Sequence, residues 1–247
     1  MFIYQLLFYA PPVERAKSIA QVAKNCRKMS KTPAYPDYYE ALAWKKGQLV
    51  CGIDEVGRGC LAGPLVVAAA ILPAHCPIDF RDSKKMTPKA RDKAFKWLVE
   101  HAAYAIARAD HAHIAKYNIY QATLYAMRKA VLMLASRQPT LFGQVGYITV
   151  DAMPLTLPAG FAHPPIASFI KGEDYSRSIA AASIIAKVTR DRLMAAIQHF
   201  FPAYQFGKDK AYASPTHCAT LKSKPATFIH RTQFITTVRT PKEKRNI

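Results

Sequence analysis

The sequence predicts an α/β protein in which helices flank a mixed sheet. Three patterns carry this prediction: two apolar runs around a glycine-containing turn at residues 49–72, alternating strand and helix patterns after them, and a long amphipathic stretch at 176–201. The early hairpin supplies antiparallel pairing, whereas alternating helices and strands favour parallel pairing. We therefore expect a sheet that contains both.

The expected elements follow in order from Leu49. The runs LVCGI and PLVVAAAIL form the two strands of the hairpin. Thr87 and Pro88 favour a helix start, because an N-cap threonine precedes a first-turn proline, and this helix runs to about His101. Hydrophobic periodicity predicts the remaining elements, which are a strand at 104–109, a helix at 119–135, strands ending at Asp151 and Lys171, and the long helix in 176–201.

Composition divides the chain into three parts. Residues 1–47 are expected to be an N-terminal extension with a basic helical stretch at 14–31 and a turn-rich run after it, and to be dispensable for catalysis. Residues 48–238 form the main domain with a helical segment near its end, and residues 239–247 form a basic tail. The apolar start of the chain is too short for a transmembrane helix, so we expect no membrane association.

The net charge of +19 is large for 247 residues and is spread along the whole chain. Such a charge attracts phosphate backbones, so it favours a nucleic-acid partner over the alternative of a merely solvated basic surface. The five cysteines contain no C-x-x-C pair, which argues against a disulfide framework or a structural zinc site. We expect a cytoplasmic monomer.

Acidic side chains stand where predicted strands end. Asp54 and Glu55 end the first apolar run, and Asp151 ends the run GYITV. Glu173 and Asp174 follow IASFIKG, directly before the long helix. The alternatives are a solvated turn for the first pair and helix-capping charges for the last. Carboxylates that lie close together repel one another unless a cation binds between them, and their oxygen atoms suit Mg²⁺ or Mn²⁺. Two such ions can drive phosphodiester cleavage.

Five blocks of sequence together resemble the ribonuclease HII family: CGIDEVGRGCLAGPLVVAAAIL, DSKK, ITVDAM, IKGED followed by SIAAASIIAKVTRDRLM, and KAYASPTH. The resemblance implies an RNase H-like fold and hydrolysis, with two divalent ions, of the bond 5′ of a ribonucleotide. The implied substrates are RNA–DNA hybrids and duplex DNA containing ribonucleotides, as in removal of misincorporated ribonucleotides and RNA primers, and the products are a 3′-hydroxyl and a 5′-phosphate. The alternatives are a non-catalytic nucleic-acid-binding relative and an enzyme like ribonuclease HIII, for whose N-terminal domain 47 residues are too few.

The resemblance also assigns site residues. The catalytic acids and metal ligands fall on Asp54, Glu55, Asp151 and Glu173, with Asp174 as the alternative fourth acid one residue later. The element that reads the ribose 2′-hydroxyl falls on Gly57, Arg58 and Gly59, where glycine allows close approach to a sugar. The tyrosine that stacks on a sugar falls on Tyr212, although Ala211 replaces the family's usual glycine before it.

Further substrate contacts are expected from basic and polar side chains. Ser183, Lys187 and Arg190 share one face of the long helix, where the alternative for Lys187 is an ion pair with Asp191. Lys84 and Lys85 in DSKK are expected near the substrate backbone for their charge. No complete zinc-ligand set is evident among the histidines, so His217 and His230 should pack or touch substrate.

Overall fold

The computed structural model describes residues 37–74, 76–77 and 86–239. Lys84, Lys85, the basic stretch at 14–31 and the tail from 240 lie outside these residues. The described elements are, in order, α2 (Tyr38–Trp44), β1 (Leu49–Val56), β2 (Leu65–Ile71), α3 (Pro88–His101), β3 (Ala103–Ala109), α4 (His111–Arg137), α5 (Pro139–Phe142), β4 (Val145–Asp151), β5 (Ile166–Phe169), the 3-10 helix η1 (Gly172–Asp174), α6 (Arg177–Ile197), the 3-10 helix η2 (Pro202–Tyr204), α7 (Phe206–Asp209), α8 (Pro215–Ser223) and α9 (Thr232–Arg239).

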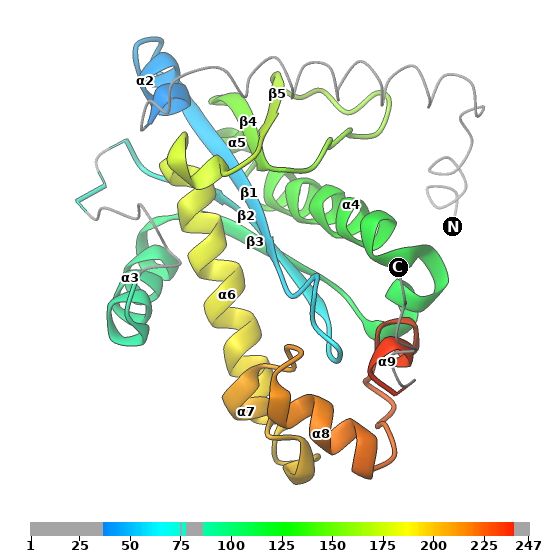
Figure 1. Cartoon of the computed structure of the whole chain (residues 1–247). Coiled ribbons are helices and arrows are strands. Elements are labelled where there is room, and N and C mark those ends of the chain that lie inside the picture. Colours follow the sequence, from blue (N-terminus) through cyan, green and yellow to red (C-terminus); the bar gives the residue numbers. More distant parts are fainter. Residues whose placement is uncertain (1–36, 75, 78–85, 240–247) are drawn as a thin grey trace, which may run out of the picture.

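The predicted mixed sheet is confirmed. Its order is β3-β2-β1-β4-β5, in which β1 pairs antiparallel with β2 and parallel with β4. Figure 1 shows α3 and α6 on one face of this sheet and α4 on the other. Both faces of the sheet are covered because alternate side chains of β2 point to opposite faces. One set, Leu65, Val67 and Ala69, packs in the core cluster with α4, and the other set, Val66 and Ala68, packs in the cluster with α3 and α6.

The long helix α6 lies directly on β1. A Cβ added at Gly52 would lie 2.0 Å from the carbonyl carbon of Ser178, so the absence of a side chain there lets the helix approach. The buried residues Ala180, Ala181 and Ala182 continue this close contact. Small residues on both elements therefore set the distance between the helix and the strand that carries the acids.

The predicted helix and strand positions agree with the structure, with differences at their ends. Thr87 caps α3 by accepting a hydrogen bond from the Ala90 N–H at 3.2 Å. In α4 the chain has a non-helical backbone at Asn118, so the expected start at 119 is the start of its second part. The strand expected to reach Lys171 ends at Phe169, because Lys171 adopts a left-handed conformation.

The helix α2 lies within the part of the chain expected to be an extension, yet it packs on the sheet. Its Tyr39 and Ala43 are buried with Val50, Phe169 and Ile179. These contacts join it to β1, β5 and α6, so an extension that ends at residue 47 does not describe this segment. We propose that the main domain begins near residue 37.

Candidate active site at the carboxyl ends of two parallel strands

The parallel pairing of β1 and β4 brings two of the predicted acids together. Ile53 is opposite Val150 in this pairing, and Asp54 and Asp151 are the next residues of the two strands. Asp54 is buried, with 9% of its surface exposed. Both acids therefore lie at the same end of these two neighbouring parallel strands.

The electrostatics of this edge disfavour negative charge. Burial, followed by the charges of Glu55 and Asp151, raises the pKa of Asp54 well above its usual value, against hydrogen bonds from Ser183 and the Glu55 N–H. Burial raises the pKa of Glu55 to about 7, and the charge of Asp151 adds to this, whereas Arg58 opposes it. Three carboxylates thus share one poorly hydrated region without enough positive charge to balance them.

A divalent cation would supply the missing positive charge. One oxygen of Glu55, Oε2, is buried and has no hydrogen-bond partner among the described residues. Its other oxygen, Oε1, accepts a hydrogen bond from Arg58 Nη1 at 3.4 Å. A buried carboxylate oxygen without a partner fits a hard cation. Within the described residues, however, no three His, Cys, Asp or Glu side chains are close enough together to hold a metal ion.

The loop after β5, which carries the two candidates for the fourth acid, is hydrogen-bonded to Asp151. The Gly172 N–H donates to Asp151 Oδ1 at 2.7 Å, and the next two residues are Glu173 and Asp174. Glu173 is partly buried and Asp174 is exposed. The N-cap of α6 is Ser176, whose side chain accepts from the Ile179 N–H, so the capping role suggested for Asp174 is wrong.

The Gly57-Arg58-Gly59 element follows β1 directly. Gly57 has a φ of +93°, and a Cβ there would lie 2.3 Å from Nε of Arg190, so this position requires glycine for two reasons. At Gly59 a Cβ would meet no atom within 4 Å. The Arg58 side chain is 38% exposed, which leaves it able to reach a ligand.

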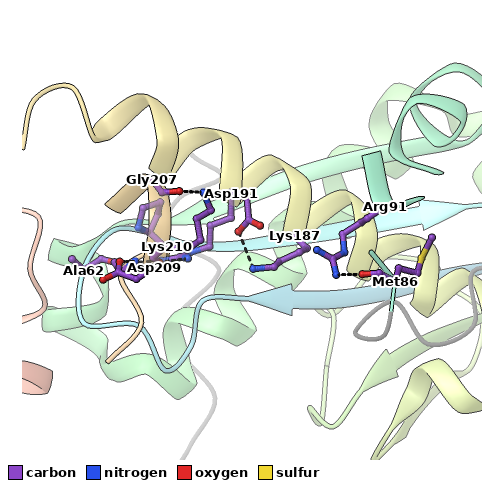
Figure 2. Close-up of polar contacts among 11 residues, drawn as sticks. Ala62, Met86, Arg91, Lys187, Asp191, Gly207, Asp209 and Lys210 are labelled. Atoms are coloured by element: carbon purple, nitrogen blue, oxygen red, sulfur yellow. Dashed lines mark hydrogen bonds and ion pairs between the residues drawn. The ribbon is translucent and has the colours of Figure 1, made fainter. Parts of the chain in front are cut away.

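Two side chains on α6 that were expected to contact substrate, those of Arg190 and Lys187, have partners within the protein. The Arg190 side chain is fully buried and donates to the carbonyl groups of Pro64, Lys210 and Ala62 at 3.0, 2.8 and 3.2 Å. A phosphate contact would require Arg190 to leave these partners, so its structural position argues for a role in holding loops. Lys187 forms the alternative ion pair with Asp191 at 2.9 Å, as Figure 2 shows.

Tyr212 lies beside these side chains. It is 39% exposed, and its ring is faced by Lys187 Nζ at 5.6 Å and by the Arg190 guanidinium at 5.8 Å. Ser183 hydrogen-bonds Asp54 from the same helix. Successive turns of α6 carry Ser183, Lys187 and Arg190, so this helix extends from the acids to Tyr212.

Two further groups were not singled out from the sequence. Glu40 is buried and accepts hydrogen bonds from the Ser176 hydroxyl at 2.7 Å and the Ser178 N–H at 2.9 Å. Arg231 is buried and donates to the carbonyls of Arg58 and Gly63 at 2.9 Å each. These contacts span more than 130 positions of sequence, and no local pattern marks them. His217 and His230, which were expected to pack or to touch substrate, lie together in the interior.

Solved structures resemble most of this architecture. The crystal structure of the ribonuclease H2 from Pyrococcus horikoshii matches with a TM-score of 0.61 at 22% identity, covering 77% of this chain and 97% of that one. That of Bst-RNase HIII in complex with Mn²⁺ matches with a TM-score of 0.62 at 19% identity, covering 84% and 72%. These likenesses show that the chain has the ribonuclease H fold.

Sequence comparison defines the family more closely. The family model for ribonuclease HII matches residues 51–237. The ribonuclease HII of Geobacter sulfurreducens is 45% identical over 206 residues, which cover 82% of this chain and 89% of that protein. The ribonuclease HII of Enterococcus faecalis is 44% identical over 199 residues, 79% of this chain and 73% of that protein. The chain belongs to the ribonuclease HII family and is an endonuclease of the ribonuclease H type.

Proposed function

We propose that this enzyme cuts the phosphodiester bond 5′ of a ribonucleotide in RNA–DNA hybrids or within duplex DNA. The observation that carries the proposal is that the buried Asp54 and the partly buried Glu55 and Asp151 interact near the end of β1, directly before the Gly57-Arg58-Gly59 turn. The turn can approach a sugar closely, and the 2′-hydroxyl distinguishes RNA from DNA there. In this proposal the three acids support cleavage, and the Gly57-Arg58-Gly59 turn selects the position of the cut.

The proposed cofactor is a pair of Mg²⁺ or Mn²⁺ ions, held by Asp54, Glu55, Asp151 and the fourth acid, Glu173. When bound, such ions activate water and stabilise the leaving oxygen. The protein's own part is to orient the carboxylates, by the Ser183 bond to Asp54 and the Gly172 bond to Asp151. Carboxylates with raised pKa values must release protons before a cation binds, so protons and metal compete.

The proposed duplex contacts are Arg58, Lys187, Tyr212 and the two lysines Lys84 and Lys85. The net charge of +19 supports binding to a phosphate backbone. In the described part of the chain no helix is both long enough and apolar enough to cross a membrane. We propose a monomer that acts in the cytoplasm.

A substrate pair tests this function. A labelled DNA duplex with one ribonucleotide and the same duplex made of DNA alone are incubated with Mg²⁺ or Mn²⁺, and the product ends are mapped. We expect cutting only on the 5′ side of the ribonucleotide. Arg58→Ala should lower this cutting far more than affinity for the all-DNA duplex. Cutting of both duplexes alike would contradict the proposed recognition of ribose.

A further inference from the structure

The loop that carries Tyr212 is held in a strained backbone conformation. Lys210 and Ala211 have φ values of +54° and +63°, a region in which residues other than glycine are uncommon. Protein groups hold the carbonyls of this loop from several sides. The Lys210 carbonyl accepts from Arg190 and the Ala211 carbonyl from the Leu61 N–H, both at 2.8 Å. The loop therefore keeps its shape through its partners.

The Tyr212 carbonyl accepts a hydrogen bond from the Ser214 N–H at 2.7 Å and is also contacted by a buried pair of histidines. His217 Nδ1 lies 2.9 Å from that oxygen, and His217 Nε2 lies 3.1 Å from Nε2 of His230. His230 Nδ1 lies 3.0 Å from the Thr227 backbone nitrogen. The two histidines are 0% and 3% exposed. A continuous chain of hydrogen bonds thus runs from the Thr227 backbone to the Tyr212 backbone.

The fixed ends of this chain determine where the protons are in the neutral pair. The Thr227 N–H can only donate, so His230 Nδ1 accepts and its Nε2 carries the proton. That proton is donated to His217 Nε2, and the proton of His217 is then on Nδ1, facing the Tyr212 carbonyl. Every bond in the chain points the same way, toward Tyr212.

We propose that His217 and His230 are positioning residues that fix the Tyr212 loop, and through it the ring that contacts substrate. The inference rests on the proposed substrate role of Tyr212. His217 acts on a carbonyl of the residue whose ring is exposed between Lys187 and Arg190. The rings of Tyr204 and Phe206 pack around the pair at centroid distances of 4.6 to 5.7 Å, so the imidazoles have little freedom to turn. The pair thereby holds the Tyr212 backbone in a fixed position relative to α8 and the segment between α8 and α9.

Two substitutions at His217 separate this role from general packing. Asparagine places its amide nitrogen where Nδ1 lies and can still donate to the Tyr212 carbonyl, whereas glutamine reaches the position of Nε2 and loses that bond. We expect His217→Gln to lower kcat/KM on the single-ribonucleotide duplex by about five- to tenfold, the value of one lost hydrogen bond. His217→Asn should stay within about twofold, and the Mn²⁺ dependence should be unchanged in both. Equal losses in the two variants would overturn the inference.

A double-mutant cycle with Tyr212→Ala distinguishes the two proposals. If His217 acts through Tyr212, then His217→Gln should cost little more in the Tyr212→Ala background. Independent, multiplicative losses would overturn the positioning role but leave the role of Tyr212 intact. Normal cleavage by Tyr212→Ala itself would instead contradict the substrate role of the ring.

The wild-type enzyme offers a test that does not depend on folding of the variants. ¹⁵N NMR of the histidine rings above pH 7 should show one buried histidine protonated at Nδ1 and its neighbour protonated at Nε2. The same tautomer on both rings would be incompatible with the chain of hydrogen bonds and would overturn the inference.

Discussion

The two carboxylate oxygens of Glu55 have different surroundings. Oε1 faces Arg58, whereas Oε2 is buried with no hydrogen-bond partner among the described residues. Burial is the largest cause of its raised pKa, so the neutral acid is favoured over a wide range of pH. The metal-free site is therefore sensitive to pH near neutrality.

This sensitivity predicts a change in stability with pH. In the metal-free protein burial raises the pKa of Glu55 to about 7, compared with its ordinary value of 4.5. Between pH 4.5 and 7 the folded state keeps a proton on Glu55 that the unfolded state has released. The contribution of this proton to the free energy of unfolding is therefore complete below pH 4.5 and is lost as the pH rises toward 7. In the presence of chelator, we expect the Tm of wild type to fall relative to the Tm of Glu55→Gln as the pH rises from 4.5 to 7. A difference independent of pH would contradict the assignment.

The fourth acid is a second question at the level of single residues. Glu173 is partly buried in the loop whose Gly172 binds Asp151, whereas Asp174 is exposed. We expect Glu173→Gln to lower the cleavage rate and to raise the metal concentration required, because it removes a ligand. The matched variant Asp174→Asn should have nearly normal rates across the metal titration. The opposite result would show that Asp174 is the ligand.

Among the elements, α2 and α6 are joined by a buried carboxylate. Glu40 binds the Ser176 hydroxyl and the Ser178 N–H at the start of α6, and burial raises its pKa. This contact holds the helix start that follows the Glu173 loop. Removing residues 1–45, which the sequence suggests are dispensable, would delete it.

The contact predicts different effects for two substitutions. Glu40→Ala leaves donors at the start of α6 without their acceptor and should lower the free energy of unfolding by about 2 to 4 kcal/mol. Glu40→Gln keeps an oxygen acceptor and avoids a buried charge, so it should cost less than half as much. Chemical denaturation of both variants measures the difference, and equal losses would mean that the side chain acts only by packing.

Periodicity in the sequence predicted α3, α6, the hairpin and the mixed sheet, because local patterns determine those elements. It also placed Asp54 and Asp151 at the ends of apolar runs, and in the structure Asp151 ends β4 whereas Asp54 lies two residues before the end of β1. The role of Arg190 could not be read in this way. Its position on the helix suggests a phosphate contact, but the structure turns its guanidinium to carbonyls 20 and about 126 to 128 residues away. Such partners depend on tertiary packing.

In the whole molecule, hydrogen bonds connect the C-terminal region with the turn after β1, the strand that carries Asp54 and Glu55. Figure 1 shows α7 and α8 beyond the end of α6 that lies far from α2, and α9 beside the first part of α4. Arg190 and Arg231 connect this region to the turn after β1 by donating to its carbonyls. The acids, the Gly57-Arg58-Gly59 turn and Tyr212 are thereby fixed relative to one another.

We propose that the acids at the ends of β1 and β4 bind the metal that drives cleavage. The direct test is the cleavage rate on the single-ribonucleotide duplex during a Mn²⁺ titration of wild type, Asp54→Asn and Asp151→Asn. We expect saturable activity in wild type that chelator abolishes, and losses of about a thousandfold or more in both variants, with metal-free Tm unchanged or higher because carboxylate repulsion is relieved. Normal metal-dependent rates in either variant would contradict the account.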